Sequence, residues 1–261
     1  MEFKWCSNVS LKDDFFKYRK KKHKIICKSS RQVIPYIIYN EGIRWGWNME
    51  NNDTLVVLIH GFTRGAKDMQ FWKKTMLPEF SRVITPDLPT TYSSFECCLE
   101  KLTAEVMAAK PENYANVCFA GHSMGGLLAR EFLQNTRLPN ARRLVCAGTP
   151  HYGSKLADIS LLLPGAGAIW KPLRALKCSA RKNITTPEIP GLEIGVIVST
   201  NNGHWPGKLF LSKNSDGLVE SFSADAPDAV ASARCEAHHI GMMFDEKTAA
   251  LIKKFFQTGG F

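Results

Sequence analysis

The residues best suited to chemistry lie in the stretch Gly121-His122-Ser123-Met124-Gly125, where one hydroxyl stands between two glycines. An apolar run typical of a β-strand ends directly before it, and a Leu- and Ala-rich run typical of a helix follows it. The glycines would leave room for the neighbouring strand and helix at a very tight turn. A serine on such a turn adopts a strained backbone conformation and holds its hydroxyl near the positive end of the helix. The pattern in this context indicates a nucleophilic serine.

A serine hydroxyl is a poor nucleophile by itself and needs a basic histidine, which in turn needs a carboxylate to orient it. For a serine on a strand-to-helix turn, the expected order along the chain is serine, acid, histidine. The histidines downstream of the serine are His151, His204, His238 and His239. The acids between the last predicted strand and His238 are Asp216, Glu220, Asp225, Asp228 and Glu236. Chain order alone does not choose within either set.

Alternating strands and helices are predicted to position these groups. Short apolar runs predict strands at 54–61, 82–89, 116–121, 142–150 and 191–200. Helices are predicted at 66–80, 93–110, 125–135 and 245–257. Two further strands, at 24–30 and 33–40, are consistent with an antiparallel edge pair. This alternation is typical of an α/β fold with a mostly parallel central sheet and helices on both faces.

The length and the pattern predict one domain. A chain of 261 residues can bury about 70–75% of its unfolded surface, which is enough for a large core. Residues 1–24 are polar and basic and are interpreted as a lead-in to a single domain at 25–261. Residues 153–191 interrupt the alternation, and they are too long for a plain connection in a compact domain. We therefore expect an inserted lid or cap there.

Five stretches together resemble the α/β-hydrolase superfamily, and within it the lipase and esterase group. They are LVVLIHGF, GHSMGG, AGTPHYGS, NSDGLVESFSA and HHIGMM, and they extend over roughly residues 54–257. The third and fourth are similar to turns in bacterial lipases and in GPI-inositol-deacylase-like enzymes. The resemblance implies the fold and the chemistry more strongly than any particular substrate.

The resemblance assigns roles residue by residue. Ser123 matches the nucleophile, Asp216 the acid in the Asp-Gly-Leu-Val turn, and His239 the base in the His-Ile-Gly-Met turn. The backbone N–H groups of Phe62 and Met124 match the two donors of the oxyanion hole. The order serine, acid, histidine is the one that this fold requires.

Other assignments stay open at this point. The Asn-Ser-Asp-Gly sequence is also simply a good β-turn, so Asp225 is a rival acid. His238 is the alternative base, because it lies one residue before the matching histidine. We interpret His60 and His122 as supporting or packing residues near the site, and His151 as part of a turn or a pocket wall.

The activity that the resemblance implies is cleavage of carboxylic esters through an acyl-enzyme. A thioesterase or an acyltransferase could use the same triad. A non-catalytic binding member of the fold, acting through its basic segments, is the alternative from another class. No metal or organic cofactor is expected, because the histidines form neither an H-E-x-x-H motif nor a Cys/His cluster.

The basic residues point to a partner surface. The net charge is +10, and residues 153–191 hold six Lys or Arg against two acids. In that segment Leu161, Leu162, Leu163 and Trp170 are candidate lid residues, followed by five cations. Apolar side chains beside cations suit an anionic membrane surface or an acyl or phospholipid ester. The alternative is a cap that packs over the pocket with its lysines in solvent. Nucleic acid is not an expected partner, since the sequence contains no binding motif for it. The sequence does not indicate an oligomeric state.

The expected location is the cytoplasm. The N-terminus lacks the apolar segment of a secretory signal, although secretion without a signal remains open. No apolar run reaches the roughly 18 residues that a membrane span needs. Eight cysteines without a Cys-x-x-Cys pair are typical of free thiols in a reducing compartment.

Overall fold

The structure is a computed structural model that describes residues 17–21, 24–28, 33–39, 42–45, 53–203 and 205–261. The chain divides into two compact units, Met1–Met49 and Glu50–Phe261, and each is described by itself. The division lies after the second predicted strand, so that strand belongs to the first unit. The proposed extent of the hydrolase domain, 25–261, stays a prediction.

The first unit contains a four-stranded antiparallel sheet in the order β1-β2-β3-β4. Its strands are β1 (Lys17–Lys21), β2 (Lys24–Lys28), β3 (Val33–Tyr39) and β4 (Gly42–Trp45). The antiparallel pair β2–β3 confirms the pairing expected for 24–30 and 33–40. The sequence predicted neither β1, which lies in the expected lead-in, nor β4.

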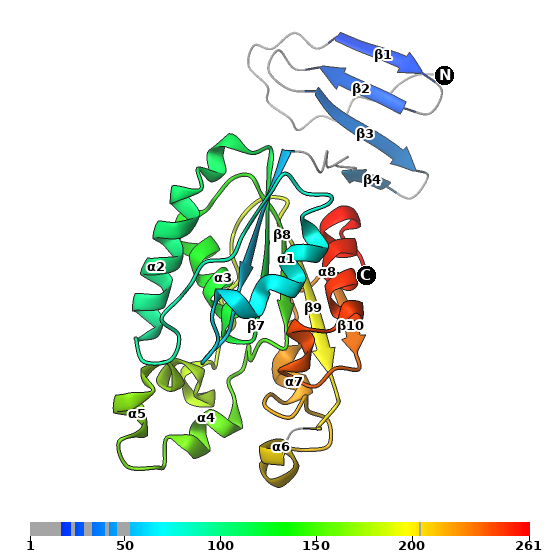
Figure 1. The fold of residues 1–261 in the computed structure, drawn as a ribbon. Coiled ribbons are helices and arrows are strands. Elements are labelled where there is room, and N and C mark those ends of the chain that lie inside the picture. Colours follow the sequence, from blue (N-terminus) through cyan, green and yellow to red (C-terminus); the bar gives the residue numbers. More distant parts are fainter. Residues whose placement is uncertain (1–16, 22–23, 29–32, 40–41, 46–52, 204) are drawn as a thin grey trace. The chain divides into compact units, whose positions relative to one another are not determined.

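The second unit is built on a parallel sheet of six strands in the order β10-β9-β8-β7-β5-β6 (Figure 1). The strands are β5 (Thr54–Ile59), β6 (Arg82–Ile84), β7 (Asn116–His122), β8 (Ala141–Ala147), β9 (Glu193–Ser199) and β10 (Ala231–Cys235). Every residue of β5 and β7 is buried, as expected for near-continuous apolar runs with helices on both faces. The predicted α/β fold with a mostly parallel sheet is therefore confirmed.

Helices cover both faces of this sheet. They are α1 (Gln70–Met76), α2 (Phe95–Ala108), α3 (Met124–Thr136) and α8 (Glu246–Thr258). Helices α2 and α3 pack together on one face, and α1 and α8 on the other (Figure 1). The side chain of Ser94 accepts a hydrogen bond from the backbone N–H of Cys97 at 3.3 Å, which makes it the N-cap of α2. Among the described residues, no helix combines the length and the apolarity needed to cross a bilayer.

The segment 153–191 folds into short helices. These are α4 (Lys155–Ser160), α5 (Ala166–Ile169) and the 3₁₀ turns η4 (Lys171–Leu176) and η5 (Cys178–Ala180). They lie, with α6 (Trp205–Phe210) and α7 (Ser221–Ala224), at the end of the sheet where the parallel strands end (Figure 1). Active sites of open α/β sheets form at that end. The role of this segment as a lid stays a prediction.

Candidate active site

Ser123 lies between the end of β7 and the start of α3, with φ 55° and ψ −125°. These angles are the strained conformation predicted for a serine at a strand-to-helix turn. A Cβ on Gly125 would lie 2.3 Å from the carbonyl oxygen of Ile59, and one on Gly121 would lie 2.3 Å from the backbone nitrogen of Gly126. Glycine is therefore required at both positions, because α3 passes so close to the sheet.

The turn after β5 lies against this serine. A Cβ on Gly61 would come within 2.9 Å of the Cβ of Ser123. His60 donates from Nδ1 to the carbonyl oxygen of Gly61 at 3.1 Å and accepts at Nε2 from the backbone N–H of Leu88 at 3.0 Å. The N–H of Phe62 points away from His60, because C=O and N–H lie on opposite sides of a trans peptide.

The two turns beside Ser123 carry the backbone N–H groups of Phe62 and Met124, and His60 contacts one of these turns. Met124 is the first residue of α3, so its N–H has no acceptor within the helix. Burial lowers the pKa of His60, which keeps its ring in the neutral form that both of its hydrogen bonds need. The two predicted oxyanion donors, Phe62 and Met124, lie on the two turns that meet at Ser123.

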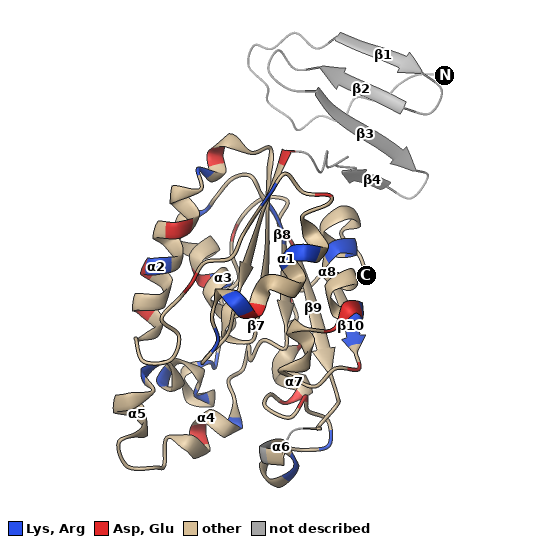
Figure 2. Ribbon diagram, in the orientation of Figure 1, with Lys and Arg blue, Asp and Glu red and all other residues tan. Residues whose placement is uncertain are grey.

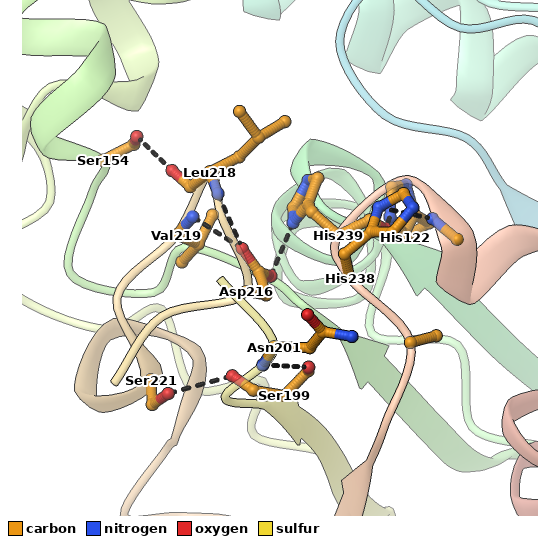
Figure 3. A network of polar contacts seen from close by, with 12 residues as sticks. His122, Ser154, Ser199, Asn201, Asp216, Leu218, Val219, Ser221, His238 and His239 are labelled. Atoms are coloured by element: carbon orange, nitrogen blue, oxygen red, sulfur yellow. Dashed lines mark hydrogen bonds and ion pairs between the residues drawn. The ribbon is translucent and has the colours of Figure 1, made fainter. Parts of the chain in front are cut away.

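Asp216 and His239 form a buried hydrogen-bonded pair. Nδ1 of His239 donates to Oδ2 of Asp216 at 2.6 Å (Figure 3). The other carboxylate oxygen accepts from the backbone N–H groups of Leu218 at 2.9 Å and Val219 at 2.7 Å. The backbone N–H of His239 also donates to the carbonyl oxygen of Asp216 at 2.9 Å. The carboxylate is thus oriented by the turn that follows it and holds the imidazole in one tautomer.

The rival residues make other contacts. Asp225 is exposed, and its Oδ1 accepts from the backbone N–H of the next residue, Ala226. The Nδ1 of His238 accepts from the backbone N–H of Gly241 at 3.3 Å. Asp228 forms a salt bridge with the buried Arg130 at 2.7 Å. The structure thus places the carboxylate of Asp216, rather than that of Asp225, against the ring of His239.

Two side chains hold the histidine loop, and of these the sequence indicated only His122, as a supporting or packing residue. Nε2 of His122 donates to the carbonyl oxygen of His239 at 2.8 Å. Nε1 of Trp72, on α1, donates to the carbonyl oxygen of Met242 at 3.0 Å. The motif position of His122 was the available signal for its importance. Nothing in the local sequence pointed to Trp72.

His151 and the lid candidates lie outside this arrangement. His151 is buried, and neither ring nitrogen has a hydrogen-bond partner among the described residues. Burial, and then the nearby Arg130, lower its pKa to about 3. Leu161, Leu162 and Leu163 line a surface hollow of about 670 Å³. That hollow is separate from the serine and the acid–histidine pair, none of which lines it.

Comparison with known proteins identifies the fold. Residues 56–250 match the family model described as the alpha/beta hydrolase family. No curated protein sequence matches the chain significantly. Among solved structures, the fold is similar to that of a mature lipase, BlEst2, from Bacillus licheniformis, with a TM-score of 0.60 and 17% identity over 77% of this chain and 89% of that one.

Two further solved structures have a similar fold. One is the metagenomic carboxyl esterase MGS0156, with a TM-score of 0.60 and 15% identity over 78% of this chain and 69% of that one. The other is a lipase-esterase related protein from Clostridium acetobutylicum, with a TM-score of 0.52 and 13% identity over 79% of this chain and 94% of that one. Identities this low establish the fold and not the substrate. The family model extends over well more than half of the chain, which therefore belongs to the alpha/beta hydrolase family.

Proposed function

We propose that this chain is a serine hydrolase that cleaves carboxylic esters through Ser123, His239 and Asp216. The observation that carries the proposal is the buried 2.6 Å hydrogen bond between Nδ1 of His239 and Asp216, in a chain whose Ser123 occupies a strained strand-to-helix turn. A nucleophile needs a base, and the base needs an orienting acid. These residues supply the three parts in the chain order that the fold uses.

The first step is attack of the serine on the ester carbonyl. Because Nδ1 of His239 donates to Asp216, its Nε2 carries the lone pair and acts as the base. Nε2 takes the Ser123 proton as Oγ bonds to the carbonyl carbon. Asp216 then stabilises the imidazolium that forms. The same imidazolium returns the proton to the leaving alcohol, which gives the acyl-enzyme.

The negative charge of the tetrahedral intermediate falls on the former carbonyl oxygen. The backbone N–H groups of Phe62 and Met124 are the donors we assign to it. Removal of one such donor costs about 3 kcal/mol of transition-state stabilisation in enzymes of this type. Water then attacks the acyl-enzyme with His239 as base, which releases the acid and frees Ser123.

The substrate we propose is an acyl ester or a lipid presented at an anionic surface. Leu162 is 81% exposed, Leu163 is 62% exposed and Trp170 is 37% exposed. On α6, which packs against α4, Trp205 and Leu209 are 68% and 65% exposed. Exposed apolar patches of this kind mark interaction sites.

Charge on the same segments supports an anionic surface. Lysine and arginine residues lie on α4, in the segment after α5 and on α6, at the end of the parallel sheet where its strands end (Figure 2). Lys171, Arg174 and Lys208 are exposed there. None of these three is in a salt bridge with another described residue. Cations beside exposed apolar side chains suit a lipid surface that carries negative charge.

The test is hydrolysis of p-nitrophenyl esters from acetate to palmitate by the wild type and by Ser123→Ala. We expect the wild type to hydrolyse them and the variant to lose nearly all activity. The profile over chain length then separates an esterase from a lipase. If a folded wild type and variant are equally inactive on every ester, the proposal is wrong, and thioester substrates test the same triad next.

A further inference from the structure

His122 occupies the space between the nucleophile turn and the histidine loop. It precedes Ser123 in the chain, and Nε2 of its buried ring donates to the carbonyl oxygen of His239 at 2.8 Å. The two rings also contact each other, with centroids 4.8 Å apart and planes inclined by 53°. Figure 3 shows the two side chains beside each other, with Asp216 on the far side of His239.

The opposite side of the His122 ring faces the turn after β5. A Cβ on Gly61 would lie 3.4 Å from Nδ1 of His122. This nitrogen has no hydrogen-bond partner among the described residues. An imidazolium would bury a second N–H without an acceptor at Nδ1, so the ring is neutral, and because Nε2 donates to a carbonyl the lone pair lies on Nδ1. Burial, and then the neighbouring His239, hold the pKa of His122 well below its usual value.

A second donor holds the same loop. Trp72, fully buried on α1, donates to the carbonyl oxygen of Met242 at 3.0 Å. Its ring meets the His122 ring edge-on, with centroids 6.4 Å apart. The loop that carries His239 is therefore held at two carbonyls, those of residues 239 and 242. The donor to the carbonyl of His239 itself is His122, the residue that precedes the serine.

We propose that His122 is a positioning residue that fixes His239 relative to Ser123 through the hydrogen bond from its Nε2 to the carbonyl of His239. This inference rests on the proposed function, because it takes His239 as the base. The backbone of one catalytic turn is thereby tied to the backbone of another by one neutral side chain. A displacement of the catalytic base by about 1 Å can lower the reaction rate about 10²-fold.

The test compares His122→Gln with His122→Met. The two replacements have the same length, but the glutamine amide can donate in place of Nε2 and the methionine cannot. With p-nitrophenyl esters we expect kcat to fall about 10²-fold in the methionine variant, with KM unchanged. The glutamine variant should recover most of that loss. A residue that acted only in packing would affect both variants alike.

A second measurement needs no substrate. In the Ser123→Ala background, proton NMR observes the hydrogen shared between Nδ1 of His239 and Asp216. We expect a low-field resonance from this hydrogen in Ser123→Ala and in the double variant that also carries His122→Gln. The double variant that carries His122→Met should lack it. If the methionine variant does not fold by circular dichroism, His122→Phe, which keeps a flat ring without the donor, replaces it.

The outcomes separate the two proposals. A wild type that hydrolyses no ester counts against the proposed function, while the resonance still reports on His122. The positioning role is wrong if the methionine variant keeps its kcat or the resonance. It is also wrong if the glutamine variant is as impaired as the methionine variant.

Discussion

Asp216 and His239 are joined twice, once through their side chains and once through their backbones. Nδ1 of His239 donates to Oδ2 of Asp216 at 2.6 Å, and the N–H of His239 donates to the carbonyl oxygen of Asp216 at 2.9 Å. The loop before α7 and the loop before α8 are therefore linked at two points. The acid is positioned by the same contacts that position the base.

Asp216→Asn tests the acid with little change in shape. The Asn Oδ1 keeps the hydrogen bonds from the backbones of Leu218 and Val219, so the turn should survive. Its NH₂ group, however, faces Nδ1 of His239 and forces the ring into the tautomer that cannot act as base. We expect kcat to fall by about 10⁴-fold with little change in KM. Steady-state kinetics on a p-nitrophenyl ester measures both.

The matched control is Asp225→Asn. Asp225 is exposed, and within the described residues its carboxylate accepts only from the N–H of its neighbour Ala226, so its amide variant should keep the wild-type kcat. Loss of activity in Asp225→Asn with retention in Asp216→Asn would reverse the assignment of the acid.

Gly61→Ala tests the contact between the turn after β5 and the serine. The new methyl group would lie 2.9 Å from the Cβ of Ser123 and 3.0 Å from the carbonyl oxygen of His122, so one of the turns has to move. We expect kcat/KM for a p-nitrophenyl ester to fall by about 10²-fold. Gly260→Ala is the control, because a Cβ there meets nothing within 4 Å. Equal activity of the two variants would contradict the close approach.

Lys171→Gln, Arg174→Gln and Lys177→Gln together test the anionic surface. Each cation near such a surface contributes about 1 kcal/mol, so binding to vesicles of anionic lipid should weaken about 100-fold at low salt. Sedimentation with vesicles in the Ser123→Ala background measures it without hydrolysis.

The control for the vesicle experiment removes the same charge elsewhere. Lys74, Lys110 and Lys254 are exposed cations outside residues 153–191. Their triple glutamine variant should bind vesicles like the parent protein. Equal weakening in both triple variants would mean that net charge, rather than this surface, governs the binding.

The strands and helices that consist of buried apolar runs could be predicted from the sequence. The exposed strand at the edge of the parallel sheet, β10, could not. β5 and β7 are buried along their whole length, so their composition alone indicates them. β10 lies at the edge of the sheet, and its first four residues alternate between partly buried and exposed, so that only Cys235 at its end is buried. The strand β6 pairs over three residues only, fewer than predicted for 82–89, and the remainder contains two prolines that cannot donate to a ladder.

The candidate site also has one part that local sequence predicts and one part that it does not. The serine could be predicted because its turn is a local feature of sequence. The contacts of His122 with His239 and of Trp72 with Met242 join residues 117 and 170 positions apart. Contacts so distant in sequence depend on how the helices pack, which no local pattern specifies. For that reason the contacts that these two donors make with the histidine loop emerged only from the structure.

Three buried histidines make the stability of the protein sensitive to acid. Burial lowers the pKa of His60, His122 and His151 in the folded state. In the unfolded chain each titrates near 6.5. Below about pH 6.5 the unfolded state therefore binds protons that the folded state does not, and the free energy of unfolding falls as the pH falls. For His151 this loss continues until its folded-state pKa of about 3.

His151→Phe tests this linkage at the one ring that has no hydrogen-bond partner among the described residues. The variant should lose less stability than the wild type between pH 7 and pH 5, by about 2 kcal/mol, because one proton no longer binds on unfolding. Urea unfolding at both pH values measures it. Phe132→Leu, a core change without a titratable group, should lower the free energy of unfolding equally at both. If His151→Phe also changes the free energy of unfolding equally at pH 7 and pH 5, His151 does not resist protonation in the folded state.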